Sequence, residues 1–231
     1  MHFLLNKGGL YKVYNGNLLY HGCVPLKEDG NLKSVRIFGH TYKGKGLYEV
    51  LESYVRKGFY AMDSKEKERG KDIMWYIWLS ENSPLFGKDK MATFERYFLA
   101  EKETHKEKKN PYYLLLEDEK VICHILKEFG LENKDAHIIN GHVPVKCKDG
   151  EKPIKCGGKV LVIDGGFSRA YQKETGIAGY TLIYNSYGLI LAAHEPFEST
   201  EAAIEKESDI HSDSTVVKRT LERKKVEDTD V

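Results

Sequence analysis

Two histidines, His21 and His142, stand where a side chain could bind a metal ion. His142 follows an apolar run that stops at Asn140-Gly141, and His21 ends the apolar segment 18–20 and precedes Gly22. β-Branched residues that end in Asn-Gly predict a strand entering a tight turn, where Asn and Gly tolerate positive φ. A strand end aims a ring more rigidly than a loop does, and neutral imidazole is the commonest metal ligand.

Each histidine taken alone is better explained as a structural residue, either buried and hydrogen-bonded or placed in a turn. The two contexts match, however, because His21 lies in His-Gly-x-x-Pro and His142 in Gly-His-x-Pro. This repetition favours a shared role as metal ligands over two unrelated structural roles.

A third strand end carries a carboxylate. The β-branched run 160–163 predicts a buried strand, and it ends at Asp164-Gly165-Gly166. Asp164 could orient one of the imidazoles from the second shell, or it could form the turn. Both roles stay open, and direct ligation is less favoured.

A loop over 80–90 carries Lys88 and Lys90. Pro84 interrupts the preceding helix and Gly87 frees the backbone. Lysines beside backbone amides are suitable for binding a phosphate. A solvated basic loop explains the same residues equally well.

The elements that must position these residues follow from hydrophobic periodicity. Strands are expected over 9–14, 18–20, 35–38 and 136–139, with His40 in a loop, and a hairpin pairs 180–184 with 189–193. Helices are expected from 45 to Gly58 and over 65–79, 93–109 and 117–129. The segment 199–231 is a polar tail with one short helix, 200–207.

Composition limits the classes of protein. The chain has 231 residues, 41% of them hydrophobic, which suffices for a buried core in one domain or two small ones. The net charge of +1 predicts no binding to nucleic acid or to a membrane surface, and no apolar run is long enough to span a bilayer. The N-terminus does not resemble a secretory signal, and four scattered cysteines predict reduced thiols in a cytoplasmic protein.

Several segments, in order along nearly the whole chain, resemble the class III (Firmicutes-type) fructose-1,6-bisphosphatases. They are 15–22 (Asn-Gly-Asn-Leu-Leu-Tyr-His-Gly), the loop 82–90 with 93–98, 139–145 (Ile-Asn-Gly-His-Val-Pro-Val), 161–168 (Leu-Val-Ile-Asp-Gly-Gly-Phe-Ser) and 175–182.

The resemblance implies an α+β, αββα fold, namely part of a calcineurin-like metallophosphoesterase β-sandwich flanked by helices. Residues 1–198 would be the C-terminal portion of that domain, with a helical insertion at about 44–130, and 199–231 would be a polar helical tail.

The resemblance also implies a reaction, the metal-dependent hydrolysis of the 1-phosphate of fructose 1,6-bisphosphate in gluconeogenesis. His21 and His142 would bind the second ion of a dinuclear Mn²⁺ site. Lys88, Lys90, Arg96 and Arg169 are the candidates for binding the other phosphate of the sugar bisphosphate.

The chain departs from that family's pattern in one respect. It lacks the superfamily's Asp-x-His, Gly-Asp-x-x-Asp-Arg and Gly-Asn-His-Glu segments, so we expect a C-terminal portion that is inactive alone. It could pair with the missing N-terminal part or with a second copy of itself. Two alternatives stay open: a related phosphoesterase with another substrate, and a non-catalytic regulatory or assembly fragment that binds a nucleotide or phosphometabolite.

Overall fold

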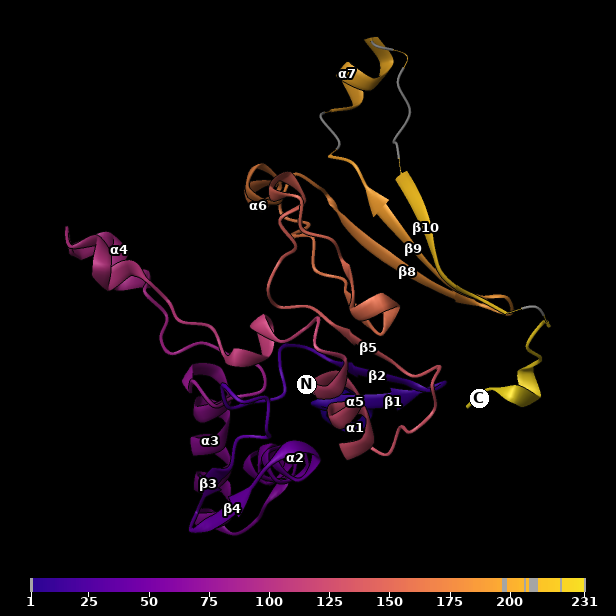
Figure 1. Cartoon of the computed structure of the whole chain (residues 1–231). Helices are drawn as coiled ribbons and strands as arrows, with labels where there is room; N and C mark the ends of the chain where they lie inside the picture. The colour runs from indigo at the N-terminus through magenta and orange to yellow at the C-terminus, as the bar shows by residue number, and fades with distance from the viewer. Residues whose placement is uncertain (1, 197–198, 206, 208–211, 221, 231) are drawn as a thin grey trace.

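A five-stranded sheet with parallel central strands organises the molecule (Figure 1). The computed structural model describes residues 2–196, 199–205, 207, 212–220 and 222–230, and of Arg169 and Ala170 only the backbone. The strand order is β1 (Tyr11–Tyr14), β2 (Asn17–Tyr20), β5 (His137–Asn140), β7 (Val160–Val162) and β6 (Ile154–Lys155). β2 pairs in parallel with β5, and β5 with β7, whereas β1 and β6 are antiparallel edge strands.

The second sheet is antiparallel and lies beside the first (Figure 1). Its order is β10 (Ser212–Arg219), β9 (Gly188–His194) and β8 (Gly179–Asn185). The hairpin expected between 180–184 and 189–193 is confirmed, because β8 pairs with β9 in antiparallel fashion. The described part of the tail expected to be helical holds α7 (Thr200–Glu205) and a short 3₁₀ helix, whereas β10 is a strand that pairs along β9 and packs Val217 against the core.

The two faces of the main sheet have different partners. Leu18, Ile138 and Val160 stand side by side in register and belong to the same buried cluster as the apolar face of α5 (Glu119–Glu128). On the other face, Ile139 and Leu161 pack against Leu189 of the second sheet. Burial on both faces explains the nearly continuous apolar sequence of β5 and β7.

A second unit combines α2 (Gly44–Tyr60) and α3 (Ser64–Leu79) with the small sheet β3 (Val35–Ile37) and β4 (His40–Tyr42). Two expectations were wrong here. His40 begins β4 instead of lying in a loop. Gly58 does not end α2, because its backbone packs against Gly70 of α3 and the helix continues to Tyr60.

The helix expected over 93–109 is the largest discrepancy. Helix α4 (Thr93–Phe98) ends after six residues, and the chain returns through the 3₁₀ helix Lys102–His105. Residues 88–109 thus form a projecting segment, here called the arm, whose two ends pair through a bridge between Lys88 and Lys109 (Figure 1). The Glu107 carboxylate holds the arm together by accepting hydrogen bonds from Lys88 and from the Ala92 N–H. The charged run after Phe98 offers no apolar face on which a helix could pack.

The remaining short elements connect these units. They are α1 (His2–Lys7), α6 (Arg169–Thr175) and the 3₁₀ helices Pro111–Leu114, Cys147–Asp149, Cys156–Gly158 and Val226–Asp228.

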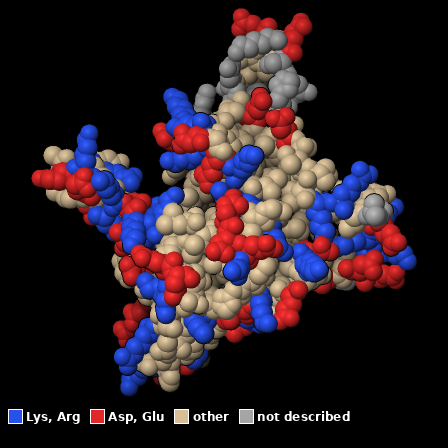
Figure 2. All heavy atoms as spheres, in the orientation of Figure 1, with Lys and Arg blue, Asp and Glu red and all other residues tan. Residues whose placement is uncertain are grey.

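All four cysteines are free. Within the described ranges, no helix combines the length and apolarity that crossing a bilayer would require. Figure 2 shows acidic and basic side chains interspersed over the visible face.

His137 gives the fold a predicted dependence on pH. Its ring is buried at the start of β5, Nδ1 donates to the Gly158 carbonyl at 2.8 Å, and no described residue pairs with the buried Nε2. Desolvation lowers the pKa of His137 despite the hydrogen bond to Gly158. The folded state binds a second proton on the His137 ring more weakly than the unfolded state does. The contribution of neutral His137 to the free energy of unfolding is therefore fully present above the unfolded-state pKa of about 6.5, and it is lost as the pH falls below that value.

We therefore expect the free energy of unfolding to decrease between pH 7.5 and 5.5, and the decrease to be smaller in His137→Asn, which keeps a donor for Gly158. The contribution of His137 to this decrease cannot exceed about 1.4 kcal/mol for each pH unit by which its folded-state and unfolded-state pKa values differ. Urea unfolding at both pH values measures this change. His124→Asn, at an exposed position on α5, should keep the wild-type slope, and equal slopes in both variants would contradict the assignment.

Candidate metal centre

The imidazoles of His21 and His142 meet. His21 Nε2 lies 2.9 Å from His142 Nδ1, and the ring centroids are 4.7 Å apart although 121 residues separate the two histidines. His142 Nε2 lies 2.9 Å from the carbonyl oxygen of Phe86. Since a carbonyl only accepts, Nε2 carries the proton and Nδ1 presents a lone pair toward His21.

Parallel strands bring these residues to one edge of the sheet. His21 follows β2, His142 lies two residues after β5 and Asp164 two residues after β7, and these three strands are adjacent. The carboxyl ends of parallel strands point the same way, and ligands bind characteristically at that edge of a sheet. A single topological feature thus gathers three of the residues selected from the sequence.

His142 itself occupies the strained position in the turn. Its φ is +67°, and the Val143 N–H donates to the Gly141 carbonyl at 2.8 Å, which closes a three-residue turn centred on His142. The expectation that Asn140 and Gly141 would take positive φ was wrong. Such a turn is rare and strained for a residue with a side chain, and strain of this kind characteristically occurs at functional sites.

Two hydrogen bonds join the histidine-bearing segments directly. The Gly141 N–H donates to the His21 carbonyl at 2.9 Å, and Asn140 Nδ2 donates to the Gly22 carbonyl at 3.0 Å. Asn140 Nδ2 also lies 3.1 Å from the Tyr112 hydroxyl, which pairs with the Tyr20 hydroxyl at 2.7 Å. This buried network fixes the spacing of the two rings.

The surroundings keep both imidazoles neutral. Desolvation lowers the pKa of His21, and the charge of Asp164 opposes this shift. Desolvation and then the neighbouring His21 lower the pKa of His142, with a smaller contribution from the Lys88 ammonium. Neutral imidazole is the form that binds a metal.

Asp164 combines features of both roles considered for it. Its Oδ1 accepts a hydrogen bond from the Gly166 N–H at 2.9 Å, as in a turn-forming aspartate. Its Cβ atom would lie 3.4 Å from a Cβ atom built at Gly141, next to His142, and its negative charge partly offsets the lowering of both imidazole pKa values. Among the hydrogen bonds of the described residues, neither imidazole donates to the Asp164 carboxylate.

The basic candidates are not gathered at the histidines. Lys88 Nζ pairs with Glu107 at 2.9 Å, Arg96 with the same carboxylate at 3.4 Å, and Lys90 Nζ donates to the Thr104 carbonyl at 2.7 Å. All three side chains thus take part in the arm, and the Lys88 charge in addition contributes to the lowered pKa of His142. Arg169 begins α6, and its side chain lies outside the described residues. Phosphate binding by all four stays a prediction.

The sequence did not single out several residues that shape the site. Asn140 was assigned only to a turn, although its amide joins the two loops. Phe86 contributes a backbone carbonyl, so its side chain carries no signal. Among the residues described by the structure, no group of three His, Cys, Asp or Glu side chains could hold a metal ion.

Asn140→Ala should destabilise the fold measurably. The change removes both hydrogen bonds of a side chain that is 2% exposed and leaves the Gly22 carbonyl unpaired. We expect the free energy of unfolding in urea to fall by about 1–3 kcal/mol. Asn6→Ala removes only an exposed hydrogen bond to Tyr60 and should cost less than about 0.5 kcal/mol, so equal losses would contradict the joining role.

Comparison with known proteins assigns the chain to a family. The profile of the Firmicute fructose-1,6-bisphosphatases matches residues 1–231. The chain belongs to this family. It is 60% identical over 229 residues to the class 3 fructose-1,6-bisphosphatase of Clostridioides difficile, and 56% identical to those of Clostridium beijerinckii and Clostridium acetobutylicum.

The match covers 99% of this chain but only 34–35% of each of these class 3 relatives. The chain therefore spans about a third of the length of the fructose-1,6-bisphosphatases that it resembles. No solved structure matches it significantly.

Proposed function

We propose that this chain supplies two imidazole ligands of a dinuclear Mn²⁺ site that hydrolyses the 1-phosphate of fructose 1,6-bisphosphate. The meeting of His21 and His142 at the carboxyl ends of β2 and β5 carries this proposal. Family membership supports the reaction. A cytoplasmic location and a role in gluconeogenesis are part of the same proposal. The proposed fold is the calcineurin-like metallophosphoesterase β-sandwich, of which the two sheets would be part.

The donor set fits a divalent transition metal. Two nitrogen ligands of one ion, with bonds of about 2.1 Å, lie about 3 Å apart, and the two ring nitrogens are 2.9 Å apart. The Phe86 carbonyl fixes the tautomer of His142 that leaves Nδ1 free, as second-shell groups do for metal-bound histidines. When bound, Mn²⁺ would supply Lewis-acid stabilisation of the charge that develops on the phosphate.

The chain's own residues prepare the site. Asn140 and the Gly141 N–H hold the two rings at a constant spacing, and Asp164 places a negative charge beside them. Lys88 lies close enough to affect His142 and could bind a phosphate oxygen of the substrate. Among the basic candidates it is the one whose charge acts on His142, although its ammonium also pairs with Glu107 in the arm.

Titration with Mn²⁺ tests the proposal on the chain itself. The ring C–H NMR signals of His21 and His142 should broaden at a lower Mn²⁺ concentration than those of His124, which is exposed on α5. His142→Ala should remove the selective broadening at His21. Simultaneous broadening of all histidines, or an unchanged His21 signal in His142→Ala, would sink the assignment.

The same preparation should release no phosphate from fructose 1,6-bisphosphate, because the described residues supply no third metal ligand beside the two imidazoles. Mn²⁺-dependent release that persists in His142→Ala would show that the activity comes from elsewhere.

A further inference from the structure

We propose that an apolar groove beside His21 is the docking surface for the polypeptide that brings the remaining metal ligands; this rests on the proposed function. The groove, here called the His21 groove, has a volume of about 960 Å³. Its apolar wall is formed by Leu10, Leu19, Leu85, Ile139 and Ile163. His21, Asn140 and Gly141 line its polar end.

The groove lies where the main sheet loses its cover. Leu19, Ile139 and Leu161 stand side by side on adjacent parallel strands and share one face. Exposure increases along this row: Leu161 is 0% exposed, Ile139 5%, and Leu19 is half-buried. The second sheet packs through Leu189 onto Ile139 and Leu161, and Leu19 of β2 lies at the margin of this cluster, where it stays partly exposed. Parallel strands are normally covered on both faces, so this part of the sheet lacks a partner.

The polar end of the groove also contains an unsatisfied group. Asn140 is 2% exposed, and its Oδ1 has no hydrogen-bond partner among the described residues although Nδ2 has two. A buried amide oxygen without a donor is costly. The unpaired atom lies on the residue that joins the two histidine loops.

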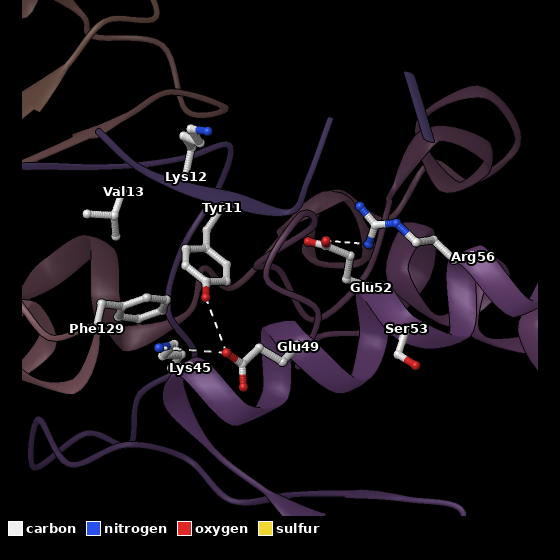
Figure 3. A pocket seen from close by; sticks show the side chains of 9 residues that line it. All are labelled: Tyr11, Lys12, Val13, Lys45, Glu49, Glu52, Ser53, Arg56 and Phe129. Carbon is white, nitrogen blue, oxygen red and sulfur yellow. Dashed lines mark hydrogen bonds and ion pairs between the residues drawn. The ribbon is translucent and has the colours of Figure 1, made fainter. Parts of the chain in front are cut away.

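A neighbouring hollow shows the opposite character. It lies between β1 and α2, has a volume of about 750 Å³ and shares Tyr11, Lys12 and Glu52 with the His21 groove. Figure 3 shows that its two carboxylates are already paired, Glu49 with Tyr11 and Lys45 and Glu52 with Arg56. That hollow presents no unpaired carboxylate to a partner, whereas the His21 groove presents apolar surface.

The relatives indicate what occupies the groove. About two thirds of each class 3 relative lies outside the match to this chain. Two imidazoles leave most of a metal ion's coordination positions open, so further imidazole or carboxylate donors must approach from the open side of His21. The occupant is therefore a segment of the remaining class 3 polypeptide that carries an apolar face and such donors.

Co-expression tests the surface without relying on activity. The chain is co-expressed with the part of the Clostridioides difficile relative that lies outside the match. The complex is then measured by light scattering, and hydrogen exchange is measured at Leu19, Leu85 and Ile163. We expect a one-to-one complex and slower exchange at these groove residues.

Matched variants separate the groove from other apolar surface. Leu85→Lys places a charge in the groove. Leu114→Lys places the same charge at a site that is 82% exposed and lies outside the groove. Leu85→Lys should weaken the complex at least tenfold and Leu114→Lys less than twofold, with binding measured below the melting transition of both variants, because Leu85 also packs against the α2–α3 cluster. Absence of a complex, equal binding by both variants, or a groove-dependent dimer of this chain alone would overturn the proposal.

The outcome also distinguishes this surface from the metal site. A complex with a protected groove, in which His21→Ala leaves Mn²⁺ affinity unchanged, would refute the proposed function and retain the docking surface. Loss of Mn²⁺ affinity in His21→Ala, with a complex insensitive to Leu85→Lys, would refute the docking surface alone.

Discussion

Replacing His142 by alanine should lower Mn²⁺-dependent phosphate release at least about 100-fold in a chimera where this chain substitutes for the matching segment of the Clostridioides difficile enzyme. The match extends over 229 residues at 60% identity, so such a chimera should assemble. The loss corresponds to about 2.7 kcal/mol of transition-state stabilisation. It arises because His142 Nδ1 is one of two nitrogens that converge 2.9 Å apart.

His21→Ala should cause a loss of similar size, and the double variant should be little worse than either single one. Residues that act as one unit are strongly non-additive, because removing the first already disables the site. Initial rates of phosphate release at saturating Mn²⁺ give the comparison.

His124→Ala is the matched control for both variants, since it removes an exposed imidazole from α5 at no cost to the site. It should retain the full rate. A His142→Ala chimera with more than a tenth of the wild-type rate would mean that this histidine is not a ligand.

Many of the strands and helices that position His21 and His142 could be predicted from the sequence, because they depend on local patterns of residues. Short apolar runs that end at glycine-containing turns correspond to β2, β5 and β7, and the helical periodicity over 65–79 corresponds to α3. The matched contexts of His21 and His142 indicated a common role before any geometry was known. Parallel pairing then placed both residues at one edge of the sheet.

The parts that sequence could not predict depend on contacts between distant residues. Glu107 organises the arm by reaching back to Lys88 and Ala92, so the charged run around it is not the helix that its composition suggested. Asn140 looks like a turn residue until β2 is beside it and the Gly22 carbonyl is within reach. The role of Phe86 rests on a backbone atom, which no residue type encodes.

Gly58 shows the same limitation in a helix. Glycine inside a helical pattern usually lowers helix stability by about 1 kcal/mol, which favoured an end to α2 at that position. The structure gives a reason to keep it, because Gly58 and Gly70 let the backbones of α2 and α3 approach closely. A Cβ atom at Gly58 would lie 2.9 Å from the Gly70 carbonyl carbon, and one at Gly70 would overlap the Gly58 backbone and the Tyr54 carbonyl.

Gly70→Ala should therefore destabilise the chain by about 3 kcal/mol, despite alanine's better helix propensity. The methyl group meets backbone atoms that cannot rotate away, so α2 and α3 must separate. That separation loosens the cluster in which Leu47 and Leu51 pack against Ile73 and Ile77. Urea unfolding followed by circular dichroism measures the change in the free energy of unfolding.

Gly46→Ala is the matched control in the same pair of helices. A Cβ atom there would contact nothing within 4 Å, so only helix propensity acts, and the variant should be about 0.5 kcal/mol more stable than wild type. The two glycine-to-alanine changes are chemically identical and should move stability in opposite directions. If both variants were equally stable, close packing of α2 on α3 would not be what requires glycine at position 70.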